Sequence, residues 1–265
     1  NKFKKNNKNT NVKVYSNFKN LNKIIKSKVD YSMSAIIGID GLNPTIQIIK
    51  FSKTIAIANK ESIICGWNLI KKKLDKHKTT FIPVDSEHFS IWYGLKNIQE
   101  KNIKKIYLTA SGGPLLNYPY DKVKNVKLKD VLNHPNWKMG KKITVDSATM
   151  MNKVFEIIEA KNIFNINLKK LSILIHPNSY VHAILSLKDG MIKIIAHETT
   201  MEIPIINSLY QQKNFSYKIK KVDIKLLNRL ELSEVNIKKF PIVKILNKIP
   251  QKISLFETAL VSAND

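Results

Sequence analysis

The chain of 265 residues contains 43% hydrophobic and 25% charged residues, which is typical of a globular protein with a sizeable core in more than one domain. Its single cysteine, Cys65, excludes an internal disulfide and favours a reducing compartment. No apolar run approaches the roughly 18 residues of a membrane span, and the opening residues lack a signal-peptide pattern, so we expect no membrane partner.

The net charge of +25 raises nucleic acid as a candidate partner. However, Arg229 is the only arginine. Proteins that recognise nucleic-acid bases and phosphates rely on arginine, whose guanidinium group donates two parallel hydrogen bonds. The lysines are spread along the chain beside many asparagines and isoleucines, as AT-rich codons would produce. We therefore expect no nucleic-acid partner. A polyanion binder remains an alternative, and it predicts salt-sensitive binding that survives the loss of Asp85 and Glu156.

The first predicted elements follow a polar, low-complexity stretch of about a dozen residues. Short apolar segments, which we expect to be strands, then alternate with amphipathic segments, which we expect to be helices; this alternation predicts an α/β fold. The apolar strand "TIAIA" leads directly into Asn59, Lys60 and Glu61, and residues 61–77 have the pattern of a helix. This places a lysine at the end of a strand, where ligands bind in open α/β sheets, although most lysines are merely solvated.

Residues 79–95 are predicted to form a strand that ends in a polar turn and opens another helix. Within "PVDSEH", Asp85 and Glu87 stand at i and i+2 on what we expect to be an extended segment, so both would project to one side. Two carboxylates so placed need a cation, although such a pair alone is more often a capped turn. Residues 103–114 then predict a strand that runs into a glycine turn at Ser111, a possible anion-binding turn.

The stretch "TVDSATMMNKVFEIIEA", residues 144–160, is predicted to form one helix with Ser147 as its N-cap. Asn152, Glu156 and Glu159 fall at i, i+4 and i+7 on one face. Serine, asparagine and Lys153 at a helix N-terminus would suit a phosphate, whereas the alternative is a solvated face with a Lys-Glu pair.

Three carboxylates, Glu156 together with Asp85 and Glu87, would offer oxygen ligands that suit magnesium or manganese. Sequence spacing alone does not bring them together.

Residues 171–198 predict strands around a hairpin turn at residues 188–190, in an antiparallel or mixed sheet. The chain then reads as polar and irregular from Pro204 to about Asn236, and residues 240–250 start a new helical region. For His88, His176 and His182 we favour hydrogen-bonded structural roles. In "HPNWKMG", Trp137 is either a lid over a ligand or part of the core.

Five stretches, in order, resemble the motifs of the 1-deoxy-D-xylulose 5-phosphate reductoisomerase family. They are "ANKES", "PVDSEH", "LTASGGP", "HPNWKMGKKITVDSATMMNK" and "IHPNSYVHAIL". The resemblance runs from about Val29 to Asp265. It implies conversion of 1-deoxyxylulose 5-phosphate to 2-C-methylerythritol 4-phosphate with NADPH and Mg²⁺ or Mn²⁺, in the non-mevalonate route to isoprenoids.

The resemblance also implies roles for individual residues. Asp85, Glu87 and Glu156 would bind the metal, with Glu159 as an acidic neighbour, and Lys60, Glu87 and Glu156 would be catalytic. The residues implied to bind substrate are Lys60, Ser86, Glu87, Ser111, His134, Trp137, Ser147, Asn152, Lys153 and Glu156. Asn59, Glu61 and Gly140 match positions that touch NADPH in the family.

The implied fold is α/β in four parts. Residues 1–84 would be the C-terminal part of an NADPH-binding Rossmann-like domain and residues 85–210 an α+β catalytic domain with a mixed sheet. Residues 211–237 would form a linker and residues 238–265 the start of a helical domain.

The glycine-rich motif G-x-T-G-S-x-G, which seats the cofactor pyrophosphate in the family, does not occur in this sequence. We therefore expect an internal fragment that is poorly active alone. The family further implies a homodimer, in the cytoplasm of a bacterium or the plastid stroma of a eukaryote. Two other readings stay open: a metal-dependent phosphosugar isomerase or aldolase without redox chemistry, and a degenerate copy with a structural role.

Overall fold

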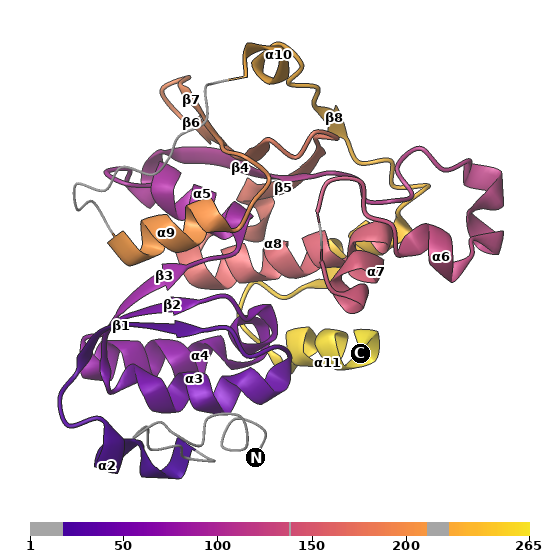
Figure 1. Ribbon diagram of the computed structural model, residues 1–265. Helices are drawn as coiled ribbons and strands as arrows, with labels where there is room; N and C mark the ends of the chain where they lie inside the picture. The colour runs from indigo at the N-terminus through magenta and orange to yellow at the C-terminus, as the bar shows by residue number, and fades with distance from the viewer. Residues whose placement is uncertain (1–17, 138, 211–222) are drawn as a thin grey trace.

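The computed structural model describes residues 18–137, 139–210 and 223–265. It contains two sheets with helices packed on them, as Figure 1 shows. The strands are β1 (Val29–Ser34), β2 (Ser52–Ile57), β3 (Thr80–Pro83), β4 (Ile103–Ala110), β5 (Leu171–Ile175), β6 (Val181–Leu187), β7 (Ile192–Ala196) and β8 (Ser233–Glu234). The α-helices are α2 (Leu21–Ile24), α3 (Leu42–Ile49), α4 (Lys60–His77), α5 (Ser86–Gly94), α6 (Leu128–Val131), α7 (Lys141–Thr149), α8 (Met151–Phe164), α9 (Glu202–Tyr210), α10 (Ile224–Leu227) and α11 (Leu255–Asn264). The 3₁₀ helices are η1 (Phe18–Asn20), η2 (Ile39–Gly41), η3 (Glu100–Asn102), η4 (Tyr120–Asn125), η5 (Leu168–Lys170) and η6 (Pro241–Lys248).

The first sheet is parallel, with strand order β1-β2-β3, and α3 and α4 lie beside each other on it (Figure 1). Its core contains Ile55 and Ile57 of β2 with Trp67 and Ile70 of α4, all buried. The apolar run of β2 is buried because helices cover a parallel sheet, which confirms the α/β prediction for this part of the chain.

The second sheet is mixed and has the strand order β7-β6-β4-β5-β8. β4 and β5 are parallel, whereas β6 pairs antiparallel with both β4 and β7. The turn between β6 and β7 contains Gly190 with φ +91°, which confirms the predicted hairpin. β8 pairs with β5, so a strand from the predicted linker completes this sheet. The four-part division into domains remains a prediction.

Helix α8 lies between the two sheets and joins them to α11. Phe155 and Ile158 of α8 pack with Ile64 of α4 and Val261 of α11 in one buried cluster. The adjacent Lys161 Nζ forms a buried ion pair with Glu257 of α11 and also donates to the Pro250 carbonyl at 3.1 Å. The helix is therefore held on its apolar side and at its C-terminal end.

Three predictions about local structure were wrong. Residues 144–160 form two helices, because Met150 adopts a left-handed conformation with φ +69° and separates α7 from α8. Just before this break, the hydroxyl of Thr149 contacts the carbonyls of Val145 and Asp146 and so competes with the helical hydrogen bonds. Ser147 is consequently part of α7, and the predicted N-cap role is incorrect.

Asp85 and Glu87 do not lie on an extended segment. Asp85 precedes α5 as its N-cap residue and Glu87 is in its first turn. The helix starts here because Phe89 and Ile91 are buried one turn further on, and because an acid in the first turn is favoured by the helix dipole.

The stretch after Pro204 is helical as far as Tyr210, not irregular. Proline is tolerated in the first turn of a helix, where its missing N–H leaves no bond unmade. Ser208 of this helix, α9, is buried and shares a hydrogen bond of 2.8 Å with the Tyr31 hydroxyl of β1. Residues 211–222 of the predicted linker lie outside the described part of the chain.

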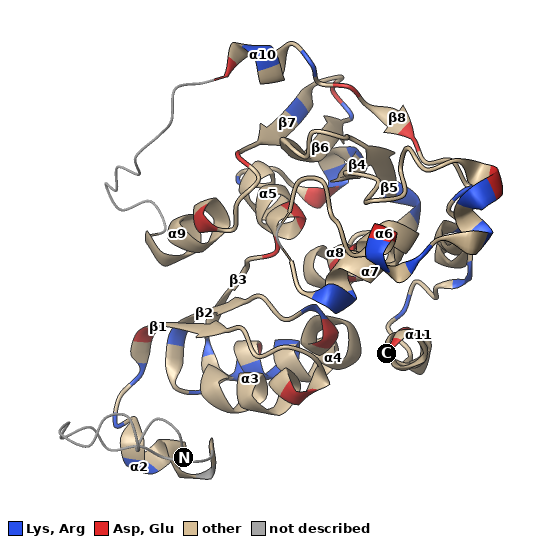
Figure 2. Cartoon of the chain, turned by 45° about the vertical axis from the view of Figure 1, so that its right-hand side comes forward, with Lys and Arg blue, Asp and Glu red and all other residues tan. Residues whose placement is uncertain are grey.

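Charged residues occur on elements of both halves of the structure, as Figure 2 shows, and basic residues occur on α4, α7 and β4 alike. Among the helices described here, none has the length and apolar character that crossing a bilayer would require.

Candidate active site

A cavity of about 290 Å³ lies where β3 and β4 end and β6 begins, near α7 and α8. Eleven of the residues predicted to form the site line it: Lys60, Asp85, Ser86, Glu87, Ser111, His134, Trp137, Ser147, Asn152, Lys153 and Glu156. Segments that are up to 96 residues apart in the sequence, from Lys60 to Glu156, therefore meet at one place.

One part of the lining, which we call the charged cluster, consists of Lys60, Asp85, Glu87, Asn152, Lys153 and Glu156. Lys60 is the first residue of α4, and its Nζ donates to the Asn152 Oδ1 at 2.6 Å. The same Nζ lies 3.2 Å from the Asp85 Oδ2 and 3.6 Å from the Glu156 Oε1. The amide of Asn152 also donates to Glu156 one turn along α8. The predicted common face of α8 thus exists, and Lys60 contacts it.

The second lysine of the charged cluster lies between two carboxylates. Lys153 Nζ donates to the Glu87 Oε1 at 2.8 Å and is 2.5 Å from the Glu156 Oε2. The Ser86 hydroxyl donates to the other oxygen of Glu87 at 2.6 Å. Each carboxylate oxygen of Glu87 therefore has a donor, and the orientation of this side chain is fixed.

Burial and neighbouring charges shift the pKa values of this cluster in opposite directions. Burial alone would lower the pKa of Lys60, but Asp85, Glu156 and the nearby Glu159 outweigh it and raise that pKa well above its ordinary value. Burial raises the pKa of Glu156 to about 7, and Glu87 adds to the rise. For Glu87 burial is outweighed by Lys153 and the hydrogen bonds, so its pKa is lowered.

The carboxylates of the charged cluster fit a divalent metal. Asp85, Glu87 and Glu156 each offer an oxygen, and the three oxygens lie within 4.8 Å of one another. Hard cations such as Mg²⁺ and Mn²⁺ prefer oxygen ligands of this kind, with positions left open for other oxygens. The predicted ligands therefore come together, although Lys60 and Lys153 neutralise them in this structure.

A second part of the lining, the hydroxyl cluster, consists of Ser111, His134 and Ser147. His134 Nε2 lies 3.2 Å from the Ser111 Oγ and 3.1 Å from the Ser147 Oγ. The Nδ1 of the same ring accepts from the backbone N–H of Trp137 at 2.9 Å, so the proton of the neutral ring is on Nε2. Burial lowers the pKa of His134 and keeps the ring neutral at pH 7. The hydroxyl cluster thus brings two hydroxyl groups and a ring N–H together, and all three groups are uncharged.

The glycine turn after β4 positions Ser111. Gly112 and Gly113 have φ of +84° and +66°, which glycine adopts without strain. A Cβ on Gly113 would lie 2.6 Å from the Ser147 carbonyl oxygen, so only glycine allows the turn to approach α7 this closely. The turn brings the Ser111 and Ser147 hydroxyls to the same imidazole.

Trp137 lines the cavity, as expected for a residue that covers a ligand. Its ring meets His182 of β6 edge-on at 6.3 Å between centroids, and His182 in turn stacks on His197 at 3.7 Å. Burial, and secondarily His197, lower the pKa of His182 well below its ordinary value. The aromatic side of the cavity is therefore uncharged.

The predicted cofactor residues Asn59, Glu61 and Gly140 do not line this cavity. The Asn59 side chain caps α4 by accepting from the Ser62 N–H at 2.5 Å, and it donates to the Gly38 carbonyl at 2.7 Å. Gly140 is exposed at the start of α7. Their assignment to NADPH stays a prediction.

Several lining residues were not predicted. They are Ala58, Thr109, Ala110, Gly112, Met139, Ile143, Met150, Ser179, Val181, His182 and Met201. His182 was interpreted as structural, yet it is the second residue of the buried strand β6, and a polar residue at the start of a buried strand was a signal that it faces a site. The apolar members carry no sequence signal that separates them from core residues.

Comparisons with known proteins agree with this geometry. A family model described as 1-deoxy-D-xylulose 5-phosphate reductoisomerase matches residues 1–66, and one for the C-terminal domain of the same family matches residues 81–164. A reductoisomerase of this name from Pelagibacter ubique (strain HTCC1062) is 61% identical over 97% of this chain and 67% of its own length. The chain belongs to the 1-deoxy-D-xylulose 5-phosphate reductoisomerase family.

Other members of the reductoisomerase family are more distant. The enzyme of that name from Wolbachia pipientis wMel is 46% identical over 82% of this chain and 56% of its own length. A crystal structure of DOX-P reductoisomerase in complex with NADPH, fosmidomycin and magnesium has 34% identity and a TM-score of 0.76, covering 83% of this chain and 56% of that one. The Zymomonas mobilis enzyme in complex with NADPH has 31% identity and a TM-score of 0.82, covering 93% of this chain and 63% of that one.

The chain thus spans between 56% and 67% of the length of these relatives. The family resemblance and the α/β fold class predicted from the sequence are confirmed.

Proposed function

We propose that the protein to which this chain belongs converts 1-deoxy-D-xylulose 5-phosphate to 2-C-methyl-D-erythritol 4-phosphate with NADPH and a divalent metal. The observation that carries the proposal is the meeting of the charged cluster and the hydroxyl cluster in one cavity. A phosphorylated sugar needs both: oxygen ligands and fixed charge for its carbonyl part, and hydrogen-bond donors for its phosphate.

The charged cluster would bind the reacting part of the substrate. A divalent cation held by Asp85, Glu87 and Glu156 would supply Lewis acidity toward a keto and a hydroxyl oxygen. Lys60 stays protonated because carboxylates surround it, so its ammonium stabilises negative charge that develops on those oxygens. Ser86, whose hydroxyl is held against Glu87, is placed to bind a substrate hydroxyl.

The hydroxyl cluster would bind the phosphate. Ser111, Ser147 and the Nε2–H of His134 already converge on one point, so they bind an anion without rearranging the backbone. Asn152 and Lys153 at the start of α8 add an amide and an ammonium. Trp137 would cover the bound substrate and exclude water.

NADPH, when bound, would supply the hydride that completes the reduction. We assign Asn59, Glu61 and Gly140 to its neighbourhood on the strength of the family motifs. One solved relative is a complex with NADPH, fosmidomycin and magnesium and another is a complex with NADPH, which supports NADPH and a divalent metal as the cofactors. We further propose a homodimer in the bacterial cytoplasm, since the similar proteins named above come from bacteria.

The test is NADPH absorbance in the full-length protein with 1-deoxyxylulose 5-phosphate and Mn²⁺. We expect oxidation that requires both substrate and metal and that is lost in Asp85→Asn. Exposed Asp121→Asn is the matched control and should retain turnover. A folded, manganese-binding protein that isomerises the substrate without consuming NADPH would favour the isomerase instead.

A further inference from the structure

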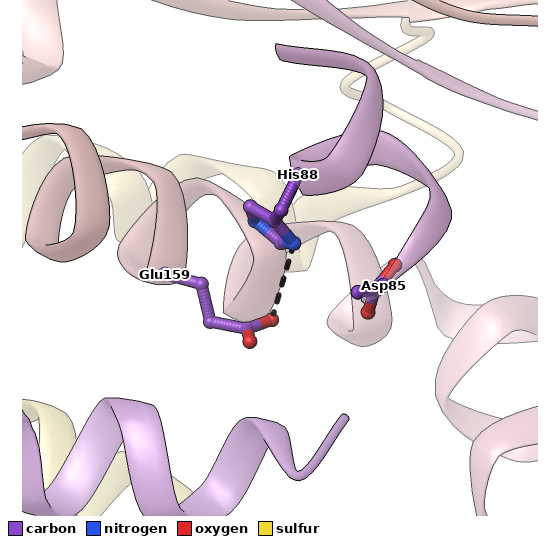
Figure 3. A group of neighbouring side chains, drawn as sticks. All are labelled: Asp85, His88 and Glu159. Atoms are coloured by element: carbon purple, nitrogen blue, oxygen red, sulfur yellow. Dashed lines mark ion pairs between the residues drawn. The ribbon is translucent and has the colours of Figure 1, made fainter. Parts of the chain in front are cut away.

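Two pairs of facing side chains lie beside the cavity, and each contains a buried histidine. In the first pair, His88 Nδ1 lies 3.9 Å from the Glu159 Oε2, and Figure 3 shows the imidazole and the carboxyl group facing each other, with Asp85 alongside. Burial raises the pKa of Glu159 to about 8, so this carboxyl is mostly protonated at pH 7. A proton therefore accounts for the first pair, and no further group is needed there.

The second pair, His182 with His197, has no such explanation. The two imidazoles lie nearly parallel, with an angle of 16° between their planes and 3.7 Å between their centroids. His182 lines the cavity and is 2% exposed, whereas His197 does not line it. His197 therefore contacts the ring of a cavity residue without reaching the cavity itself, and none of the roles proposed above uses it.

Backbone carbonyls fix the orientation of both rings. His182 Nε2 lies 3.2 Å from the His197 carbonyl oxygen, and His197 Nδ1 lies 2.8 Å from the Glu198 carbonyl oxygen. A carbonyl oxygen only accepts, so these two nitrogens carry the protons of the neutral rings. The backbone N–H of His197 also donates to the Tyr180 carbonyl at 3.0 Å, which ties this segment to the residue before β6. The stacked rings are therefore held by the backbone on both sides.

The contact continues from His182 to Trp137. The indole meets the His182 ring at 71° with 6.3 Å between the centroids, an edge-to-face arrangement that aromatic pairs favour. Among the described residues, no other aromatic ring contacts Trp137. The bond from the Trp137 N–H to His134 fixes the backbone and not the rotation of the indole. The orientation of the indole therefore depends on where His182 lies.

We propose that His197 is a positioning residue, which holds His182 by stacking and so keeps the Trp137 indole in the orientation that covers a bound phosphosugar. The inference rests on the proposed function for the identity of that ligand. The ring face of His197 is the part that acts, because its Nε2 is buried without a hydrogen-bond partner among the described residues. Without the stack, one face of His182 loses its packing and the ring can rotate away from Trp137.

The test separates the ring of His197 from its hydrogen bond. His197→Phe keeps an aromatic face but loses the donor to the Glu198 carbonyl, whereas His197→Asn keeps a side-chain N–H but loses the ring. In full-length protein labelled with 5-fluorotryptophan, ¹⁹F NMR without substrate reports the surroundings of Trp137, whose signal is assigned by its loss in Trp137→Phe. The signal should shift and broaden in His197→Asn and keep its wild-type position in His197→Phe. His77→Asn, outside the cavity, is the matched control and should leave the signal unchanged.

Kinetics then measure the effect on the substrate. KM for 1-deoxyxylulose 5-phosphate should rise about tenfold in His197→Asn with kcat within about threefold, because the cover over the substrate loosens while the reacting groups are untouched. In a Trp137→Ala background, the same substitution should raise KM no further, since effects that pass through one residue are not additive. If His197→Asn does not fold, His197→Ala takes its place with the same expected results.

Three results would overturn the proposal. They are a wild-type Trp137 signal in His197→Asn, an unchanged KM in that variant, and a full rise in KM in the Trp137→Ala background. A wild type that binds the phosphosugar without turnover would contradict the proposed function alone, because the ¹⁹F signal is measured without substrate.

Discussion

The charged cluster and the hydroxyl cluster line the same cavity but are built differently. In the charged cluster, side chains from the first turns of α4, α5 and α8 lock one another through ion pairs such as Lys153 to Glu87, 2.8 Å. In the hydroxyl cluster, a neutral imidazole from a loop bridges two serines. Under the proposed function, the charged cluster would act on the reacting atoms of the substrate, whereas the hydroxyl cluster would only bind its phosphate.

The largest expected effect is on turnover, from the charged cluster. Glu156→Gln removes a metal ligand and a partner of both lysines, so kcat/KM should fall about a thousandfold, as the loss of several kcal/mol of charge stabilisation implies. Steady-state kinetics with Mn²⁺ check this. The exposed Glu100→Gln is the control and should change nothing. A loss of less than tenfold would mean that this carboxylate is not at the reacting atoms.

Lys153 contacts two carboxylates of the charged cluster and would also bind the substrate phosphate, so its substitution should change both metal and substrate affinity. Lys153→Met should raise KM for the phosphosugar about 10- to 100-fold, since a hydrogen bond to a charged group is lost. Mn²⁺ affinity should rise, because the ammonium no longer competes for Glu87 and Glu156. Metal titration followed by kinetics separates the two effects. Unchanged metal affinity would show that the lysine is not a competitor.

A smaller effect is expected from the hydroxyl cluster. His134→Asn preserves an acceptor for the Trp137 N–H but removes the Nε2 donor, so KM should rise about tenfold with Mn²⁺ affinity unchanged. His77→Asn, outside the cavity, is the matched control. If His134→Asn weakened Mn²⁺ binding as much as substrate binding, the two clusters would not be separate in function.

The smallest effect on turnover is expected from the ion pair behind α8. Glu257→Gln leaves Lys161 buried without its partner, which should cost about 3–5 kcal/mol of stability with kcat unchanged in the protein that remains folded. Chemical denaturation measures the loss. The control compares kcat of wild type and variant without denaturant, at a temperature well below the melting temperature of both. A large fall in kcat under these conditions would contradict the prediction.

The pH dependence of that ion pair has a definite sign. Burial would raise the pKa of Glu257, but the hydrogen bonds from Lys161 and Ser254 outweigh it and lower the pKa below its ordinary 4.5. The stabilisation is therefore fully present above about pH 4.5 and is lost as pH falls through the lowered value. Wild type should lose more stability than Glu257→Gln on acidification through this range.

Much of the site was predictable from the sequence because its residues stand in long, specific motifs. The face shared by Asn152, Glu156 and Glu159 follows from helical spacing alone. The position of Lys60 at a strand end predicted a ligand-binding place for it, but its contacts with this face are seen only in the structure. The meeting of Asp85 with Glu156 was not derivable, since it depends on how α5 and α8 pack.

The errors have local physical causes. Hydrogen bonds from Thr149 and the left-handed Met150 broke a helix whose apolar spacing was continuous. The stretch from Pro204 was predicted to be irregular, although this proline lies in the first turn of α9, where proline is tolerated.

The most direct test of the central claim is the position of the substrate phosphorus relative to the metal. Pulsed EPR on the Mn²⁺-loaded full-length protein with 1-deoxyxylulose 5-phosphate would measure ³¹P coupling to the ion. We predict a weak dipolar coupling, because the phosphate is held by Ser111, His134 and Ser147 and not by the metal. A strong contact coupling, typical of a phosphate bound directly to Mn²⁺, would contradict the assignment of the two clusters.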